Sequence, residues 1–327
     1  MLSPLPMSRP GGEARLAPTM DAIAVLLNRS SGAAARNGPD HQDLESVSAA
    51  LRATGLDRAV QVAEGSALGT LARRAVANGA RLVVAGGGDG TVSTVAAALV
   101  GTEASLGILP LGTLNHFAKD LGIPLDAAGA AAVIAEGHTA RVDVGEVNGR
   151  TFINNSSVGL YPSLVYHREK HEDQGRGRWV ALALALSRVW RLYRRVRVSV
   201  AAGGVSRQIR TPFVFVGNNE YHLEGVRIGA RARLDAGLLH VSMAPGLGRA
   251  EMLYVLGRAL AGRSTDDRLD TFSVPEFAID ARRRRVPVAL DGEIALLPTP
   301  LRYRTRPGAL RVCVPDPAAA LDRAPQK

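Results

Sequence analysis

The chain has little cysteine, few aromatic residues and no long apolar run. Cys313 is the single cysteine in 327 residues, so an internal disulfide is excluded and nothing argues for secretion. The longest unbroken apolar run is the eight residues Trp179–Leu186, against the roughly 20 that a membrane-spanning helix needs. The sequence also lacks G-x-x-x-x-G-K-[ST] and G-x-G-x-x-G, which excludes a P-loop enzyme and the usual dinucleotide fingerprint.

Basic residues outnumber acidic ones, with 40 Lys and Arg against 30 Asp and Glu and a formal net charge of +10. Such a surface attracts polyanions, whether phosphorylated ligands, nucleic acid or anionic lipid headgroups, and charge alone does not choose among them. Aromatic residues make up only 4% of the chain and no nucleic-acid-binding motif occurs, so we expect no nucleic-acid partner. The first twenty residues hold no apolar stretch of signal-peptide length, and we expect a cytoplasmic protein.

Two sequence styles divide the chain. From Asp21 to Glu136, short β-branched runs alternate with alanine-rich helical stretches, which predicts βα units and a doubly wound, mainly parallel sheet. From Thr139 onward, strand candidates follow one another and predict a second, antiparallel β-rich domain. The fold class is therefore α/β, with an N-terminal parallel domain and a β-rich second domain.

We expect a flexible tail over 1–20, a first domain over 21–138 that 301–315 could complete, a second domain over 139–300 and a tail over 316–327. From Thr139 onward, helices are predicted over Trp179–Arg195 and Arg249–Ala261. Strands are predicted over Ala140–Val147, Thr151–Asn155, Val196–Ala201, Ile209–Val216, Leu238–Met243, Thr271–Ile279, Val286–Leu290, Leu301–Thr305 and Leu310–Val314.

The strongest local signal is Gly86-Gly87-Gly88-Asp89-Gly90-Thr91, which follows a predicted strand and opens a predicted helix. Glycines let backbone N–H groups approach a phosphate without a Cβ clash, and the helix adds its unpaired N–H groups and the positive end of its dipole. Asp89 would repel a phosphate unless a magnesium ion lay between them. The alternative is an ordinary tight turn, which would not need three consecutive glycines.

Two further loops carry polar residues. Residues 109–124 lie between a strand and a helix, and would sit beside the glycine loop at the carboxyl edge of the sheet. Thr113 and Asn115 offer short polar groups there, which plain N-capping would also explain. Asp291-Gly292-Glu293 follows a second-domain strand and could point two acids into a cleft, although read alone it is a hairpin turn.

Taken together, the three segments resemble the diacylglycerol, sphingosine and ceramide lipid-kinase family, and most closely its bacterial members. That family carries G-G-G-D-G-T, then P-x-G-T-x-N-[DH]-F-A-[RK]-x-L-G-I-P and a late D-G-E, which 86–91, 110–124 and 291–293 match. The resemblance runs in order from about Ala22 to Val314. The second loop is its specific part, since NAD kinases and some phosphofructokinases carry a similar glycine motif.

The resemblance implies an N-terminal nucleotide domain, a second domain for the lipid, and a cleft between them for MgATP and a lipid hydroxyl. By that resemblance ATP binds Gly86–Thr91 and Thr113, with Asn28, Ser31 and Asn115 near it. The implied activity is an ATP-dependent lipid kinase that converts diacylglycerol to phosphatidic acid. A sphingoid base or another lipid acceptor, an NAD-kinase-like nucleotide kinase and a catalytically weak lipid- or nucleotide-binding protein remain the alternatives.

The catalytic group implied by the resemblance consists of three acids. Glu293 is the expected general base, since a carboxylate can accept the proton of an attacking hydroxyl. Asp291 is a neighbour that helps to bind magnesium, and Asp89 is the acid of the glycine loop. The expected cofactors are ATP and Mg²⁺.

Three positions depart from the family's pattern. Arg29 replaces a proline after the first strand, and His116 replaces an acid with a group that is neutral or positive at pH 7. Where relatives carry Asp-Asp-Gly, this chain has Asp235-Ala236-Gly237, and Ala236 cannot ligate the structural metal of that segment. A metal site there would need Asp235 as the substitute.

Two arginine clusters have two interpretations. One is the run Arg282–Arg285, and the other consists of Arg188, Arg191, Arg194, Arg195 and Arg197, in and just after the predicted helix Trp179–Arg195. Both could be solvated faces, or both could dock on anionic lipid at about 1 kcal/mol per basic residue. We therefore expect a lipid substrate at an anionic bilayer as partner, with peripheral association at the inner membrane face, and a homodimer stays open.

Overall fold

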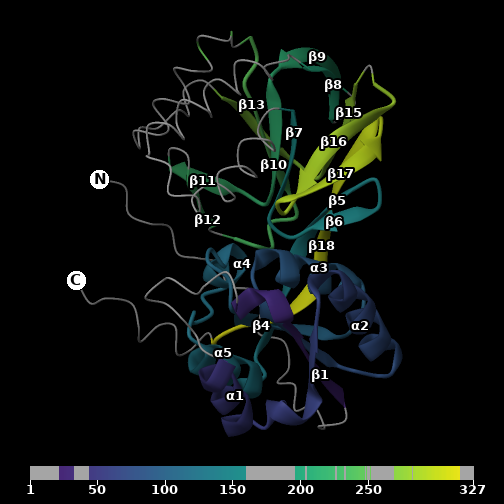
Figure 1. Cartoon of the computed structure of the whole chain (residues 1–327). Coiled ribbons are helices and arrows are strands. Elements are labelled where there is room, and N and C mark those ends of the chain that lie inside the picture. The colour runs from purple at the N-terminus through teal and green to yellow at the C-terminus, as the bar shows by residue number, and fades with distance from the viewer. Residues whose placement is uncertain are drawn as a thin grey trace, which may run out of the picture. The chain divides into compact units, whose positions relative to one another are not determined.

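The computed structural model describes residues 22–32, 44–159, 196–202, 205–224, 227–231, 233–246, 248, 251, 269–281 and 283–316 (Figure 1). The chain divides into two compact units, residues 1–144 with 307–327 and residues 145–306. The predicted helix Trp179–Arg195, most of the predicted helix Arg249–Ala261 and nearly all of both predicted tails lie outside the described residues. Among the described residues, no helix combines the length and the apolar character needed to cross a membrane.

The first unit is built on a parallel sheet. Its strands are β1 (Ile23–Asn28), β2 (Val60–Ala63), β3 (Leu82–Gly87), β4 (Ser105–Pro110) and the end of β18 (Leu301–Cys313). They lie in the order β2-β1-β3-β4-β18, and each neighbouring pair is parallel. Val25, Val84 and Leu106 are fully buried. Such unbroken apolar strands are typical of a parallel sheet that is covered on both faces.

The described residues of this unit form five α-helices: α1 (Leu44–Ala53), α2 (Gly65–Ala77) and α3 (Asp89–Leu99) lie between its strands, and α4 (His116–Asp120) and α5 (Ala127–Glu136) follow β4. α2 packs with α3, and α1 packs with α5. Parallel strands joined by right-handed crossovers place their helices on both faces of a sheet. The predicted doubly wound, mainly parallel architecture of the first domain is confirmed. Its consequence is that the loops after β1, β2, β3 and β4 all leave the same, carboxyl edge of the sheet.

The second unit is antiparallel. Its six-stranded sheet has the order β14-β13-β10-β7-β16-β17. These strands are β7 (Asn155–Gly159), β10 (Phe213–Asn218), β13 (Leu239–Met243), β14 (Asp270–Val274), β16 (Arg285–Leu290) and β17 (Glu293–Pro298). A second group consists of the start of β18 and of β15 (Glu276–Asp280), β8 (Val196–Ala202), β9 (Val205–Thr211), β6 (Arg150–Phe152) and the end of β5 (Thr139–Val147). A separate hairpin joins β11 (Tyr221–Glu224) to β12 (Arg227–Arg231). The predicted β-rich second domain is confirmed.

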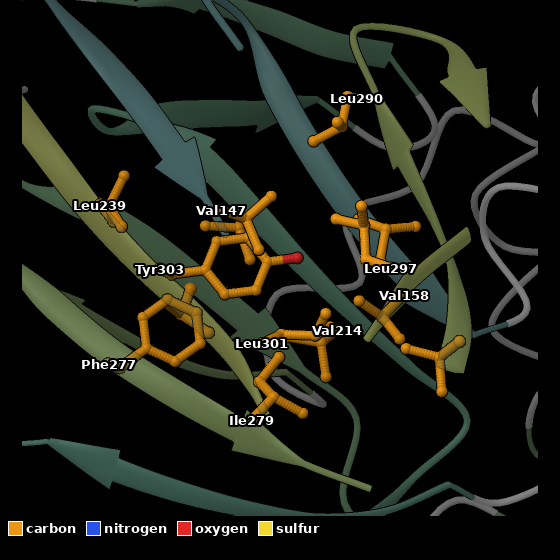
Figure 2. Close-up of a cluster of buried hydrophobic side chains, with 14 of the residues drawn as sticks. Val147, Val158, Val214, Leu239, Phe277, Ile279, Leu290, Leu297, Leu301 and Tyr303 are labelled. Carbon is orange, nitrogen blue, oxygen red and sulfur yellow. The ribbon is translucent and has the colours of Figure 1, made fainter. Parts of the chain in front are cut away.

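An aromatic cluster lies at the centre of the second unit's core (Figure 2). The ring of Tyr303 stacks on Phe277 at 4.9 Å between centroids, and Phe152 meets Tyr303 edge-on at 6.3 Å. The Tyr303 hydroxyl lies 3.0 Å from Ser156 Oγ on β7, and burial raises the pKa of the phenol. Tyr303 thus provides both the apolar contact and the buried hydrogen bond that link β18 to β7.

Several predicted strands have different boundaries because of proline. The strand predicted over Ile209–Val216 is two strands, β9 and β10, separated at Pro212, and the one predicted over Thr271–Ile279 breaks at Pro275 into β14 and β15. Proline has no N–H for the ladder, so neither stretch continues through it.

For β18 the prediction was wrong in the other direction: two separate strands were predicted, but the structure has one strand that runs unbroken through Pro307 and Gly308. Asp143 Oδ1 accepts the Gly308 N–H at 2.9 Å at this point. A side chain from β5 therefore takes over where the proline interrupts the ladder.

The predicted strand Thr151–Asn155 is also divided, because β6 ends at Phe152 and β7 begins at Asn155. Ile153 and Asn154 between them face the turn after β16, through hydrogen bonds that form part of the candidate site.

Candidate active site

The glycine loop links β3 to α3 in the first unit. A Cβ on Gly86 would strike Leu27 Cδ2, and a Cβ on Gly87 would lie 2.5 Å from Thr91 Cβ. Real Cβ atoms do not approach another Cβ so closely, so Gly87 is required by the packing of the chain itself, whereas a side chain at position 86 would first have to displace the end of Leu27. A Cβ on Gly90 would meet nothing within 4 Å. The loop therefore combines two closely packed glycines with one that borders open space.

The start of α3 leaves backbone donors available. Gly88 is the N-cap and gives no side-chain cap, and the first intrahelical bond runs from the Val92 N–H to the Gly88 carbonyl at 3.1 Å. The N–H groups of the first turn have no acceptor within a helix, and they carry the positive end of the helix dipole. Asp89 is half-buried in this turn, and its Oδ1 accepts the Phe117 N–H at 3.4 Å. The geometry is that of an anion site with one carboxylate beside it.

The second loop packs directly against the first. A Cβ on Gly112 would strike Gly88 Cα, and the Leu111 N–H donates to the Gly87 carbonyl at 3.0 Å. The close approach requires glycine at position 112, whereas a Cβ on Gly88 would lie 3.4 Å from Gly112 Cα, which is an ordinary contact. The two loops therefore lie side by side at the carboxyl edge of the sheet, as predicted.

Asn115 organises the second loop from within. Its backbone is left-handed, with φ of 50°, and its side chain is buried. Its Oδ1 accepts the Gly112 N–H at 3.0 Å, and its Nδ2 donates to the Gly112 carbonyl at 2.7 Å. Asn115 makes no side-chain cap on α4, so its contacts hold the loop in place, whereas Thr113 and His116 are exposed.

The loop after β1 reaches the same edge through Asn28. Its Nδ2 donates to Thr91 Oγ1 at 2.8 Å, and its Oδ1 accepts the Ser30 N–H at 3.1 Å. Asn28 thereby connects the 3-10 turn η2 (Arg29–Gly32) to the start of α3. The side chain of Ser31 lies outside the described residues. The structure brings together all the other nucleotide-site candidates.

The third motif forms the hairpin turn between β16 and β17 in the second unit. Asp291 and Gly292 have φ of 46° and 91°, and Leu290 pairs with Glu293, which is a two-residue turn of type I′. The Asp291 carboxylate accepts three backbone N–H groups: Oδ2 from Ile153 at 2.9 Å, and Oδ1 from Asn154 at 2.8 Å and Asn155 at 3.0 Å. Its magnesium role stays a prediction, and the contacts present are structural ones.

The environment of Glu293 differs from that of Asp291, although the two acids are only two residues apart in the chain. It is the first residue of β17 and its side chain is exposed. An exposed carboxylate keeps both oxygens accessible, which a group that takes a proton from a hydroxyl needs. The two acids of the turn are therefore not equivalent.

A buried arginine, which the sequence did not single out, supports the segment that holds Asp291. Arg231 is 4% exposed, and its Nη1 donates to the carbonyls of Ile153 at 2.7 Å and Asn218 at 3.0 Å. Its Nη2 donates to Asn154 Oδ1 at 2.9 Å, and its Cζ lies 5.1 Å from the centre of the Tyr221 ring. No local pattern marks this role, because the partners are up to 78 residues away in the chain.

The predicted metal residue is engaged in an ion pair. Asp235 Oδ1 lies 3.0 Å from Arg233 Nε, and the Ala236 N–H donates to Asn219 Oδ1 at 3.1 Å. The described residues contain no group of three or more His, Cys, Asp or Glu that could hold a metal ion. A metal at Asp235 stays a prediction, and its carboxylate would first have to leave Arg233.

Comparison with known proteins gives matches along most of the chain. A model of the diacylglycerol kinase catalytic domain matches residues 22–147, and a model of the YegS C-terminal NAD kinase beta sandwich-like domain matches residues 169–314. A protein of Pseudomonas aeruginosa PAO1 named "Probable lipid kinase YegS-like" is 35% identical over 297 residues, which cover 88% of this chain and 94% of the relative. A protein of Pseudomonas fluorescens Pf-5 with the same name is 32% identical over 290 residues, which cover 86% and 93%.

The fold also has solved counterparts. The crystal structure of a diacylglycerol kinase from Bacillus anthracis str. Sterne matches with a TM-score of 0.66 and 23% identity, over 91% of this chain and 98% of that chain.

Proposed function

Because this chain belongs to the diacylglycerol kinase catalytic-domain family, and within it to the YegS-like lipid kinases, we propose that it transfers the γ-phosphoryl group of ATP to the free hydroxyl of diacylglycerol. The products would be phosphatidic acid and ADP. The observation that carries this proposal is the contact of Gly88 with Gly112 beside the uncapped start of α3. That contact places the second loop, with its exposed Thr113 hydroxyl, beside the N–H groups of the first turn of α3, where a phosphate could bind.

Each nucleotide-site residue has a definable task in this proposal. The N–H groups at the start of α3 would hold phosphate oxygens, and the exposed Thr113 hydroxyl would donate beside them. Asn28 and Asn115 would not need to touch the nucleotide, since their side chains already hold the loops that do. Positioning of this kind is the main requirement of phosphoryl transfer, which needs little covalent chemistry from the protein.

Magnesium fits the residues that are present. Mg²⁺ usually keeps several waters and binds through one or two carboxylates together with substrate phosphates, so it needs no cage of protein ligands. Asp89, half-buried in the first turn of α3, is the carboxylate placed for this. When bound, the ion would neutralise charge on the phosphates during transfer.

Glu293 is the proposed base in the second unit. Its exposed carboxylate would accept the proton of the lipid hydroxyl as the hydroxyl oxygen bonds to the γ-phosphorus. Asp291 would contribute indirectly, because its three N–H contacts fix the turn from which Glu293 projects.

The test is transfer of radiolabel from ATP to lipid in mixed micelles. Purified protein would be offered diacylglycerol, sphingosine, ceramide or no lipid, each with and without magnesium. We expect label in phosphatidic acid alone and only with magnesium. Label in a sphingosine or ceramide product would keep the kinase and replace the acceptor.

Two matched variants separate the base from general effects on charge. Glu293→Gln should lower turnover by about 100-fold or more, within the range that a general base contributes, and leave ATP binding intact. Glu276→Gln removes another exposed acid of the second unit, on β15, and should leave turnover within about twofold. Turnover of Glu293→Gln close to that of the unmodified chain would refute the assignment of the base.

A further inference from the structure

The outward face of the β16–β17 hairpin is apolar, contrary to the usual pattern. Val286, Val288 and Leu297 point into the core of the second unit. The alternate positions form the cross-strand pairs Pro287–Leu296 and Ala289–Ile294 on the other face. A half-buried antiparallel sheet normally has polar residues at such positions.

This face is open to solvent along β17 and at Pro287, whereas Ala289 on β16 is buried. Ile294 is 51% exposed and Leu296 is 59% exposed, and β17 is the edge strand of its sheet. The other exposed large hydrophobic residues among those described, Val62, Leu114 and Leu125, belong to the first unit. In the described part of the second unit, large exposed apolar side chains therefore gather on a single strand.

Three arginines lie at the open end of the same hairpin. Arg283, Arg284 and Arg285 are exposed, and Arg285 pairs with Pro298 at the end of β17. Thr299 fixes the backbone there, because its N–H donates to the Arg284 carbonyl at 3.1 Å and its hydroxyl to the Arg283 carbonyl at 2.7 Å. None of the three pairs with a carboxylate of the described residues. Their charges remain available to an outside anion.

We propose that this surface, formed by Pro287, Ile294, Leu296 and Arg283–Arg285, docks the protein on an anionic lipid bilayer. The apolar side chains enter the interface between headgroups and acyl chains, and the arginines bind the headgroup phosphates. Charge complementarity favours a bilayer over a second copy of this chain, since a net charge of +10 repels a copy and attracts an anionic surface.

Docking through this hairpin has a consequence for catalysis. Glu293 forms the last cross-strand pair before the turn and directly precedes Ile294. By the same alternation Glu293 lies on the opposite face of the hairpin from Ile294, so docking would bring the turn that carries the proposed base to the membrane surface without inserting its carboxylate. This inference rests on the proposed function only in taking a lipid surface as the occupant.

The test is cosedimentation of the full-length chain with phosphatidylcholine vesicles, with and without phosphatidylglycerol, and without ATP. We expect binding that requires phosphatidylglycerol and weakens with salt. Ile294→Ser/Leu296→Ser should lower the partition coefficient about tenfold or more, since two half-exposed aliphatic side chains are lost. Arg283→Gln/Arg284→Gln should lower it about fivefold per arginine, on the phosphatidylglycerol vesicles alone.

A matched control removes apolar side chains elsewhere. Val62→Ser/Leu125→Ser changes two comparably exposed positions of the first unit and should leave binding within about twofold. Equal loss in both double variants, or no loss in either, would overturn the proposal. So would a change from dimer to monomer in Ile294→Ser/Leu296→Ser without loss of vesicle binding, because the surface would then join two copies.

A second measurement keeps this inference separate from the kinase proposal. With a short-chain, monomeric diacylglycerol as acceptor, Ile294→Ser/Leu296→Ser should keep turnover within about threefold, because no bilayer is needed. Vesicle binding without any kinase activity in the unmodified chain would refute the proposed function and leave docking intact. Kinase activity with vesicle binding unchanged by the variants would refute docking and leave the function intact.

Discussion

Replacing Asp291 by asparagine separates the two roles that an acid in this turn can have. Asparagine tolerates the left-handed backbone, with φ of 46° at this position, so the turn itself is preserved. Its one oxygen can keep the bonds from Asn154 and Asn155, whereas its amide group would face the Ile153 N–H as a second donor. One charge-assisted hydrogen bond is lost and two become neutral.

The expected cost follows from these contacts. Hydrogen bonds to a charged group contribute about 1.5–3 kcal/mol each and neutral ones about 1 kcal/mol, so Asp291→Asn should destabilise the segment by about 3 kcal/mol. The direct readout is hydrogen exchange of the amides of Ile153, Asn154 and Asn155, which should lose about 100-fold of their protection. Local exchange is preferable to a single unfolding midpoint, because a chain with two units need not unfold in one step.

Glu293→Gln is the matched control for this prediction. It removes an exposed carboxylate from the same hairpin and should leave the protection of those amides unchanged within about 0.5 kcal/mol. If Asp291→Asn leaves exchange unchanged while the magnesium concentration for half-maximal activity rises about tenfold, Asp291 is a metal ligand and the structural reasoning is refuted.

Three further predictions concern Gly112, Cys313 and Arg231. Gly112→Ala should separate the two glycine loops and weaken ATP binding about tenfold or more in calorimetry, with the melting temperature as the check on folding. Burial raises the pKa of the Cys313 thiol to about 12, so iodoacetamide at pH 8 should label the native chain far more slowly than the unfolded one by mass spectrometry. This burial stabilises the fold fully below an unfolded-state pKa near 9.0, and the contribution is lost as pH rises through the folded value. Arg231→Lys should lower kcat about tenfold with the KM for ATP unchanged, because lysine cannot reproduce the forked contacts, whereas exposed Arg233→Lys should change neither.

The two-part fold could be predicted from the sequence because its signals are local. A chain in which apolar strands alternate with helices commonly folds into a parallel sheet covered by helices on both faces, and the first unit has this architecture. The ends of strands were predicted less well where a proline determines whether the strand continues. Pro212 and Pro275 end strands that hydrophobicity alone would continue, whereas Pro307 lies inside β18, where a side chain of β5 accepts the next N–H.

The candidate site divides in the same way. Gly86 and Gly87 were predicted from the sequence as part of a phosphate-binding loop after a strand, and the structure places them in such a strand–helix loop, while their contact with a phosphate stays a prediction. The contacts of Arg231 could not be predicted, because its role depends on carbonyl groups of Ile153 and Asn218 that only the folded chain brings to it. The residue type alone does not distinguish a buried arginine from an exposed one.

The turn after β16 shows why its aspartate needs an explanation beyond turn geometry. A two-residue type I′ turn favours Asn-Gly at least as strongly as Asp-Gly, so the hairpin alone gives no preference for a charge at position 291. The three N–H groups of residues 153–155, which converge on this side chain, do favour a negative charge at position 291, since a carboxylate accepts such bonds more strongly than an amide. Those donors belong to the break between β6 and β7, which is also the segment that Arg231 holds from its other side. The Asp291 carboxylate therefore joins the β16–β17 turn to the segment between β6 and β7, and in doing so it fixes the turn from which Glu293 projects.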